Sequence, residues 1–547
     1  MENLGIGSWL QRRRPKSGTK AAVIAGTREL SYEEFARRAA RLANALRDRG
    51  VAKGDRVAYL GENDPSFLET LFAAGLLGAV FVPLNTRLAP PEIQFQLQDS
   101  GAVLLVHAAA LAGLAERGSA GTAVQGRVVV DDGDASADVL SSAEDALSSG
   151  GAVPDGSGAA PAVVGSASAA SAEEFEAVLA SGAELAPDVP VGLDDPAMIL
   201  YTSGTTGNPK GALLTHGNIT WNCINVLVDF DFSSADVALM ISPMFHVASL
   251  DMGVLPTLLK GGTVVLEPRF DPRRTLELIQ QHRATTISGV PTTYQMLCEH
   301  PDWDSTDLSS LNKLTCGGSA VPMRVLEAYE RRGLRFSNGY GMTETAPGAT
   351  TLPAARSRDK AGSSGLPHFF TDVRVADPLD PEAGQAAPGA VGEIQIKGPN
   401  VIEQYWNRPE ASADSYTPDG WFKSGDMGYK DPDGFVFISD RLKDMIISGG
   451  ENIYPAEVEQ AIAELDAVGS VAVIGVPDEK WGEVPRAVVL LREGAGLTED
   501  QLRAHLDGRL ARYKIPKSVV FVDEMPRTAS GKIRKAELRK LAPANGQ

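Results

Sequence analysis

The chain has 547 residues, of which 43% are hydrophobic and 22% are charged, a composition typical of globular proteins and not of disordered ones. Single domains usually have about 50–250 residues, so we expect two to four units. The net charge of -19 at pH 7 argues against a general nucleic-acid-binding protein.

The distribution of apolar residues indicates neither a membrane span nor a secretory signal peptide. No apolar run approaches the roughly 18 residues that suggest a membrane span, and residues 1–18 lack the apolar core of a signal peptide. The three cysteines, Cys223, Cys298 and Cys316, are far apart and have no metal-binding spacing. We therefore expect a reducing, cytoplasmic compartment.

The first hundred residues alternate between helix and strand patterns. Residues 31–50 begin with Ser31, place Glu34 three positions later and end at a glycine, which predicts a capped amphipathic helix. Residues 55–61 predict a short buried strand, and residues 65–79 predict a second helix. This alternation predicts an α/β fold with a largely parallel sheet.

Regular patterns weaken across residues 107–188. Residues 148–174 are a Gly/Ala/Ser tract with little to bury, so we interpret residues 107–188 as containing an exposed or flexible insertion without chemistry. The one strand-like piece in this region is residues 126–132.

Regular patterns resume near residue 195 and change character towards the C-terminus. Residues 391–400 and 434–450 are rich in β-formers, and residues 456–494 predict a helix followed by two strands. Residues 441–547 contain 16 basic and 16 acidic side chains, so the whole net charge falls on residues 1–440. Both changes predict a domain boundary at residues 440–443.

A loop rich in Gly, Ser and Thr, YTSGTTGNPKG, occupies residues 201–211. Its hydroxyls, backbone N–H groups and Lys210 suit phosphate oxygens, although a plain glycine-rich turn is the alternative. It is not a Walker A loop, because Pro209 replaces the second glycine and Gly211 replaces the Ser or Thr that follows the lysine.

Three further segments combine residues that suit a nucleotide. Residues 338–345, NGYGMTET, offer Glu344 as a Mg²⁺ ligand beside phosphate. Asp426 could accept ribose hydroxyls, and Arg441 could bind the same ribose or a phosphate. Lys532 lies in PRTASGKIRK, residues 526–535. Each of these groups, taken alone, could equally be a surface charge.

Together, and in this order, the four segments resemble the adenylate-forming superfamily of acyl-CoA synthetases, peptide-synthetase adenylation domains and firefly-type luciferases. The strings YTSGTTGNPKG, YGMTET, GWFKSGD, DRLKDMIISGGENIYP and PRTASGKI define the resemblance. It implies an α/β fold with a large N-terminal domain, residues 1–440, made of two packed α/β subdomains and a small β-barrel. A small mobile α+β domain, residues 441–547, would move about the hinge residue Lys443.

The resemblance also implies a two-step ligase reaction and assigns site residues. A carboxylate would attack the α-phosphate of Mg-ATP to give acyl-AMP and pyrophosphate, and CoA would then displace AMP. The catalytic group would comprise Lys532, Thr343, Glu344 and His246. The β- and γ-phosphates would contact Thr202, Ser203, Gly204, Thr205, Thr206, Gly207 and Lys210. Adenine would lie near Gly317, Gly318, Ser319, Ala320, Asn338, Gly339 and Tyr340, with Gly341 and Met342 also contacting the nucleotide. Asp426 and Arg441 would bind the ribose, Glu344 and Thr205 the metal, and Gly449 and Gly450 would line the CoA tunnel.

The predicted acyl pocket is mostly small or apolar, which suits an apolar acid of medium to large size. Its candidate residues are Trp221, Asn222, His246, Val247, Ser288, Gly289, Val290, Gly318, Ser319, Gly341 and Met342. Amino-acid-activating relatives usually carry a Phe-Asp dipeptide where this sequence has Phe245-His246, which argues against an α-amino acid. Asp251 is a weaker candidate for an amine contact.

The acceptor of the acyl group stays open between two hypotheses. The chain could perform both half-reactions with CoA, or it could deliver acyl-AMP to an acyl carrier protein or to a separate thiolating enzyme. A homodimer is also open. A non-catalytic role is disfavoured because both Lys532 and Glu344 are present.

Overall fold

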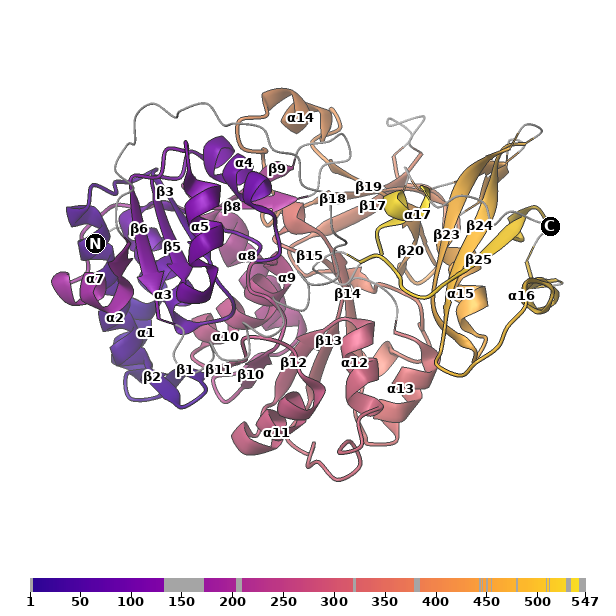
Figure 1. The fold of residues 1–547 in the computed structure, drawn as a ribbon, viewed down its shortest axis with the longest axis horizontal. Coiled ribbons are helices and arrows are strands. Elements are labelled where there is room, and N and C mark those ends of the chain that lie inside the picture. The colour runs from indigo at the N-terminus through magenta and orange to yellow at the C-terminus, as the bar shows by residue number, and fades with distance from the viewer. Residues whose placement is uncertain are drawn as a thin grey trace, which may run out of the picture.

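The computed structural model describes residues 3–131, 172–202, 209–317, 321–377, 384–441, 444, 446–448, 451–453, 455–478, 481–507, 509–510, 512–527 and 533–540. Four sheets organise these residues (Figure 1). Two are large and largely parallel, as the alternation of helix and strand predicted.

The first large sheet has the strand order β7-β6-β5-β3-β4-β8-β9. Its neighbours pair in parallel except β8 and β9, which form an antiparallel hairpin. The strands are β3 (Arg56–Leu60), β4 (Val80–Pro83), β5 (Leu104–Ala108), β6 (Gly126–Val130), β7 (Glu173–Glu174), β8 (Pro196–Thr202) and β9 (Lys210–Thr215).

The second large sheet has the order β16-β15-β14-β13-β12-β10-β11-β1-β2, with a parallel centre and antiparallel edges. Its strands are β1 (Ala21–Ala25), β2 (Arg28–Ser31), β10 (Val237–Met240), β11 (Thr263–Leu266), β12 (Thr286–Gly289), β13 (Lys313–Cys316), β14 (Phe336–Gly341), β15 (Gly348–Leu352) and β16 (Leu366–Pro367).

Two smaller sheets follow in the chain. The first is antiparallel, in the linear order β17-β18-β19-β20, and stands where the resemblance implies a small β-barrel. The second has the order β22-β21-β24-β23, with β25 pairing in parallel with β24. The strands are β17 (Asp372–Ala376), β18 (Gly392–Lys397), β19 (Phe422–Lys430), β20 (Val436–Arg441), β21 (Ile446–Ser448), β22 (Glu451–Ile453), β23 (Val468–Asp478), β24 (Gly482–Leu491) and β25 (Ser518–Val522).

Helices cover the sheets and join them. They are α1 (Ser8–Ser17), α2 (Tyr32–Asp48), α3 (Pro65–Leu77), α4 (Pro90–Ser100), η1 (Ala109–Leu111), α5 (Ala112–Ser119), α7 (Phe175–Ser181), α8 (His216–Asp229), α9 (Val247–Ser249), η3 (Leu250–Val254), α10 (Leu255–Lys260), α11 (Pro272–His282), α12 (Pro291–Cys298), α13 (Met323–Glu330), η4 (Thr343–Thr345), η5 (Ala354–Arg356), α14 (Pro409–Asp414), α15 (Pro455–Ala463), α16 (Glu499–Leu506), η6 (Arg512–Lys514) and α17 (Lys535–Leu538). None of the described helices is both long and apolar enough to cross a membrane.

One apolar core joins the two large sheets. It contains Tyr59 and Phe81 from the first sheet, Val264 from the second, and buried residues of α1, α2, α3, α8 and α10 between them. Because burial of apolar surface is the main stabilising term in folding, these helices fix the two large sheets relative to each other. This arrangement confirms the predicted large α/β unit.

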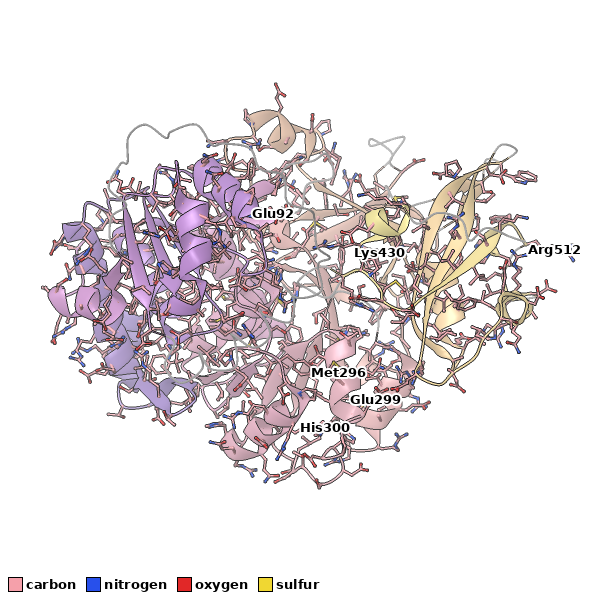
Figure 2. All side chains as sticks on the ribbon, viewed as in Figure 1. Glu92, Met296, Glu299, His300, Lys430 and Arg512 are labelled. Carbon is pink, nitrogen blue, oxygen red and sulfur yellow. The ribbon has the colours of Figure 1, made fainter. Side chains whose placement is uncertain are left out.

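The C-terminal elements α15, α16, β23, β24 and β25 gather at one end of the molecule, opposite the N-terminal elements (Figure 1). They enclose their own core, which includes Val458, Val473 and Leu502. At the border, Glu299 after α12 accepts from Arg324 at 2.7 Å and lies 3.9 Å from Arg492 after β24 (Figure 2). This smaller unit confirms the predicted fold class.

The local predictions for the N-terminal hundred residues are confirmed. In α2 the hydroxyl of Ser31 accepts from the backbone N–H of Glu34, as expected of an N-cap. Strand β3 and helix α3 lie where they were predicted, and α3 ends at Gly78 in the left-handed conformation (φ 65°).

Residues 107–188, which were predicted to contain an insertion, also contribute elements to the fold. Within residues 107–188, helix α5 and strand β6 belong to the first large sheet and its cover, and so do β7 and α7. The strand-like piece predicted at residues 126–132 is β6, whereas α5, β7 and α7 were not predicted, because such short elements give weak periodicity. Most of the Gly/Ala/Ser tract lies outside the described residues.

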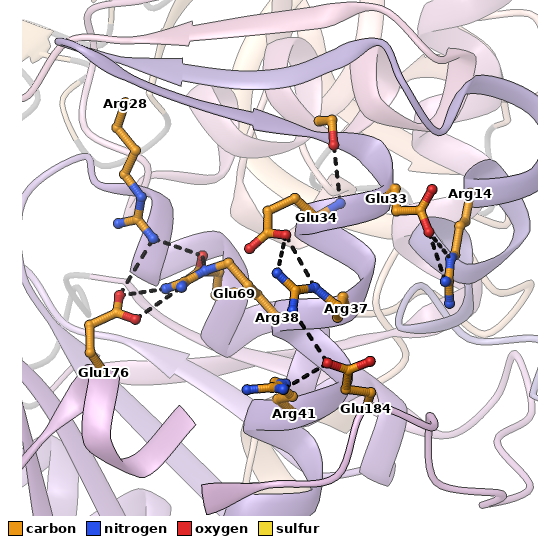
Figure 3. A network of polar contacts seen from close by, with 11 residues as sticks. Arg14, Arg28, Glu33, Glu34, Arg37, Arg38, Arg41, Glu69, Glu176 and Glu184 are labelled. Atoms are coloured by element: carbon orange, nitrogen blue, oxygen red, sulfur yellow. Dashed lines mark hydrogen bonds and ion pairs between the residues drawn. The ribbon is translucent and has the colours of Figure 1, made fainter. Parts of the chain in front are cut away.

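A buried ion-pair network fastens α2 to its neighbours (Figure 3). The Glu69 side chain of α3 is fully buried and accepts from Arg38 of α2 at 2.6 Å. Arg38 also donates to Glu176 of α7 at 2.6 Å, and Arg28 lies 3.4 Å from Glu69. Burial raises the pKa of Glu69, and the Arg38 guanidinium opposes that rise.

Candidate active site

The two ends of the predicted phosphate loop are held in the β8–β9 hairpin. Thr202 ends β8 and Lys210 begins β9, and the two residues are paired in register. The hydroxyl of Tyr201 donates to Asp99 of α4 at 2.9 Å, which fixes the strand before the loop. Residues 203–208 lie outside the described residues, so the loop's own contacts remain predictions.

Tyr405 joins Lys210 to Glu344. Its hydroxyl donates to Oε1 of Glu344 at 2.8 Å, and Nζ of Lys210 lies 5.4 Å from its ring centroid, which is within cation–π range. Burial, together with the Glu344 carboxylate, raises the pKa of the Tyr405 hydroxyl, so the hydroxyl stays protonated and donates. The structure thus brings together a cation and a carboxylate 134 positions apart in the chain.

Glu344 is nearly buried and its backbone is also fixed. It lies in η4, beside Thr343, and its carbonyl oxygen accepts from the N–H of Ile402 at 2.9 Å. The alternative of a solvated loop acid does not describe Glu344, because only 9% of the residue is exposed.

The predicted ribose residues Asp426 and Arg441 are directly paired across β19 and β20. Asp426 is buried, and its Oδ2 accepts from the hydroxyl of Tyr340 at 2.7 Å. Tyr340 lies near the end of β14, so one hydrogen bond connects the predicted adenine and ribose segments. The side chain of Arg441 lies outside the described residues.

Asn338 and Gly339 precede Tyr340 on β14, and Asn338 is paired in register with Cys316 on β13. The side-chain oxygen of Asn338 is buried and, within the part of the chain that the structure describes, has no hydrogen-bond partner. Gly317 follows β13 directly, so the two predicted adenine segments are neighbours.

Gly341 cannot carry a side chain. A Cβ there would lie 1.6 Å from the carbonyl oxygen of Pro347, far inside van der Waals contact. The backbone at the end of β14 therefore approaches η4 and β15 more closely than any other residue type would permit.

The predicted acyl-pocket residues lie on neighbouring parts of the fold. Trp221 and Asn222 come from α8, His246 and Val247 from the start of α9, Ser288, Gly289 and Val290 from the end of β12, and Gly341 and Met342 from the end of β14. Asn222 is fixed by two hydrogen bonds: its Nδ2 donates to the carbonyl of Asp251 at 2.8 Å and its Oδ1 accepts from the N–H of Gly348 at 3.0 Å. Both of these hydrogen bonds of the Asn222 amide are to backbone groups.

Asp251 is fully buried, and neither of its carboxyl oxygens has a hydrogen-bond partner in the described structure. Burial raises the pKa of this carboxyl well above its ordinary value. The amine contact at Asp251 stays a prediction.

Several predicted residues lie outside the described part of the chain. They are Ser203, Gly204, Thr205, Thr206, Gly207, Gly318, Ser319, Ala320, Lys443, Gly449, Gly450 and Lys532. Their assignments stay predictions. Tyr405 is the residue that sequence reasoning missed, because nothing in its surroundings, EQYWNRPE, indicates phosphate chemistry.

Family comparison agrees with this geometry. The AMP-binding enzyme family matches residues 10–406, which is more than half of the chain, and the AMP-binding enzyme C-terminal domain matches residues 457–532. The chain belongs to the AMP-binding enzyme family. The resemblance inferred from the five sequence strings is therefore confirmed.

Known members of the AMP-binding enzymes match along their full length. The chain is 49% identical to feruloyl-CoA synthase from Amycolatopsis sp over 99% of both chains, and 41% identical to indoleacetate–CoA ligase from Aromatoleum aromaticum over 98% of both. The ATP-bound structure of MatB from Rhodopseudomonas palustris aligns with a TM-score of 0.84 at 31% identity, over 98% of both chains. The chain is accordingly an AMP-forming acid–thiol ligase.

Proposed function

We propose that this ligase activates an aryl carboxylic acid with ATP and transfers the acyl group to CoA. In the first step a carboxylate oxygen attacks the α-phosphorus, the α–β phosphoanhydride bond breaks, and pyrophosphate leaves. In the second step the CoA thiolate attacks the acyl carbon and AMP leaves. Both steps need alignment of reactants and neutralisation of negative charge.

The contact of Tyr405 with both Lys210 and Glu344 is the observation that supports the first step most directly. Pyrophosphate develops negative charge as it leaves, and Lys210 at the loop end would hold it. Glu344 would bind a divalent cation beside the same phosphates. A Walker loop serves transfer of the γ-phosphate, whereas this arrangement suits departure of the β- and γ-phosphates together.

The donor set fits Mg²⁺, which prefers one or two carboxylates plus phosphate oxygens. Glu344 would supply the carboxylate and Thr205 a hydroxyl, with Thr343 close to the α-phosphate. Bound Mg²⁺ neutralises phosphate charge. The Tyr405 hydroxyl would orient the Glu344 carboxylate towards it.

Replacing Tyr405 with phenylalanine should raise the Mg²⁺ concentration needed for half-maximal adenylation by about tenfold or more, as loss of a residue that orients a metal ligand usually does. The ring would still face Lys210. The measurement is pyrophosphate release against Mg²⁺ at fixed ATP. Tyr32→Phe is the matched control, since it removes a buried hydroxyl that donates to the carbonyl of Gly262 at 2.6 Å, away from the phosphate loop. An unchanged Mg²⁺ dependence in Tyr405→Phe would exclude the proposed orientation.

The base and sugar of ATP would bind between β13, β14 and β19. The buried side-chain oxygen of Asn338 would accept from the exocyclic amino group of adenine, beside the Tyr340 ring. Asp426 would accept ribose hydroxyls, since a carboxylate has several acceptor positions and the Tyr340 hydroxyl holds this carboxylate beside the predicted adenine segment.

The acid is proposed to be aromatic because two full-length relatives act on feruloyl and indoleacetate groups. The pocket residues agree, since most are small or apolar and none is an arginine that would pair a second carboxylate. The test is a panel of cinnamate-like, aryl-acetate and C8–C16 alkyl acids, with pyrophosphate release as the readout. A preference for alkyl acids throughout the panel would overturn the aryl assignment.

The second step is proposed to need rotation of residues 441–547 about Lys443, with Gly449 and Gly450 lining the path of the thiol. Lys443→Pro should leave acyl-AMP formation within about threefold of the wild type and block thioester formation, because proline fixes φ at the hinge. Acyl-AMP and acyl-CoA are measured by mass in the same reaction. A wild-type rate of acyl-CoA formation would remove Lys443 as the hinge.

Delivery of acyl-AMP to an acyl carrier protein is the alternative, and reactions with and without CoA separate the two. We also propose a cytoplasmic location, because Cys223, Cys298 and Cys316 are all free thiols.

A further inference from the structure

His368, which follows β16, forms a buried pair with Asp229 at the end of α8. Nδ1 of His368 lies 2.5 Å from Oδ2 of Asp229, and the imidazole is fully buried. The backbone N–H of Phe369 also donates to Oδ2 of Asp229, at 3.3 Å. Neither residue belongs to the nucleotide site described above.

The pairing leaves one imidazole nitrogen available. A carboxylate only accepts hydrogen bonds, so Nδ1 of His368 carries a proton, and in the singly protonated ring Nε2 presents a lone pair. Nε2 is buried and has no hydrogen-bond partner among the described residues. Buried polar groups are almost always paired, so an orphan acceptor of this kind calls for a donor that the described residues do not supply.

The orphan nitrogen lies beside the predicted acyl pocket. A Cβ on Gly348 would stand 2.9 Å from Nε2 of His368 and 2.9 Å from Oδ1 of Asn222. Gly348 is paired with Gly341 across β14 and β15. Asn222 and Gly341 are both predicted pocket residues. Nε2 of His368 therefore lies close to the pocket wall at Gly348, which has no side chain.

The segment that carries His368 is firmly attached to the same helix as the pocket. Phe370 donates its N–H to Asn225 of α8 at 2.8 Å, and its ring lies edge-on to Trp221 at 5.1 Å. His368 itself donates its N–H to the carbonyl of Ala349 in β15 at 3.1 Å. These contacts fix the imidazole in one orientation, as a recognition group requires.

We propose that the acid carries a hydroxyl on its aromatic ring and that Nε2 of His368 accepts the hydrogen bond from that hydroxyl. Asp229 is the positioning residue that holds the required tautomer. This inference rests on the proposed aryl-acid function and names the group by which the acid is selected. An aromatic acid without a ring hydroxyl would leave Nε2 buried and unpaired, which is how a polar pocket rejects an apolar analogue.

The test compares kcat/KM for adenylation of 4-hydroxycinnamate, 3-hydroxycinnamate, cinnamate and 4-methoxycinnamate. The better hydroxylated acid should exceed cinnamate by at least about tenfold, and the methyl ether, which cannot donate, should gain nothing. His368→Phe should abolish this preference while cinnamate is still activated. His368→Gln, which restores an acceptor, should recover part of it.

Two further variants separate recognition from stability. Asp229→Asn should reduce the preference, because the ring is no longer held in the Nδ1–H tautomer. His216→Phe is the matched control: His216 is also buried with an unpartnered Nε2, but its Nδ1 accepts from the N–H of Ile6. The His216→Phe variant should have the same ratio of kcat/KM for the hydroxylated acid to kcat/KM for cinnamate as the wild type. A ratio of two substrates does not depend on the folded fraction.

Equal kcat/KM for hydroxylated acids and cinnamate in the wild type would overturn this inference and leave the aryl-acid function standing. An unchanged preference in His368→Phe would also overturn it. Failure to activate any of the four acids or any aryl-acetate would overturn the aryl-acid function itself, and this inference with it.

Discussion

Replacing Lys532 with alanine is expected to lower the rate of acyl-AMP formation by roughly 10²-fold or more, the usual cost of removing a group that stabilises transition-state charge. The attacking carboxylate and the α-phosphate are both anionic. Lys532 would bridge them with a positive charge once the C-terminal domain closes, so its loss leaves their repulsion uncompensated.

ATP binding should stay within about threefold of the wild type, because loss of an interaction made only in the transition state lowers kcat and leaves ground-state binding alone. The measurements are acyl-AMP formation by mass and ATP affinity by calorimetry. Lys535→Ala is the control, since Lys535 pairs with Glu459 at 2.9 Å within the same domain. If Lys532→Ala forms acyl-AMP at a rate comparable to the wild type, the assignment of the lysine is wrong.

Replacing Arg38 with methionine is expected to destabilise the protein by about 3–5 kcal/mol, the usual result of breaking a buried ion pair on one side. Glu69 is completely buried and would keep only Arg28, whose closest nitrogen lies 3.4 Å away and whose side chain is 38% exposed. Glu176 would also lose its closest partner.

The double variant Arg38→Met/Glu69→Leu should recover most of that loss, because apolar replacement of a whole buried pair is often neutral. In Arg38→Met alone the deficit should shrink as the pH falls. Burial raises the pKa of Glu69 in the folded state. Between the unfolded and the folded pKa of Glu69, the folded state therefore binds more protons than the unfolded state, and stability rises as the pH decreases. Unfolding by urea at pH 7 and at pH 5 measures both effects. Equal destabilisation in the single and double variants would contradict the ion-pair account.

Local patterns were enough to predict α2, β3 and α3, although α1, β1, β2, β4 and α4 were not predicted. The cap at Ser31 and the stop near Gly50 depend on neighbours in sequence, and the structure has them. Strand β6 was also recognised, but β7 and α7 were missed because β7 has two residues and α7 has seven, too few for a clear period. The place of β7 in the sheet is set by its pairing with β6, a contact between distant parts of the chain.

The same limit applies to the site. Residue chemistry indicated Glu344, Asp426 and Lys210 separately, and the family resemblance supplied their roles. The Tyr405 contact with Glu344 joins positions 61 apart, and the Tyr340 contact with Asp426 joins positions 86 apart. No sequence motif encodes such contacts, since they depend on the register of β14, β19 and the hairpin of β8 and β9. Burial of Glu344 and Asp426, which excludes a solvated surface charge, likewise follows only from the fold.

The central claim is that one chain forms an aryl adenylate and transfers it to CoA. The direct measurement incubates the purified protein with ATP, Mg²⁺ and 4-hydroxycinnamate, with and without CoA, and identifies the products by mass. The account predicts acyl-AMP and pyrophosphate without CoA, and acyl-CoA with stoichiometric AMP when CoA is present. Formation of ADP and phosphate would contradict the adenylation step, and acyl-AMP that CoA does not discharge would contradict the transfer step.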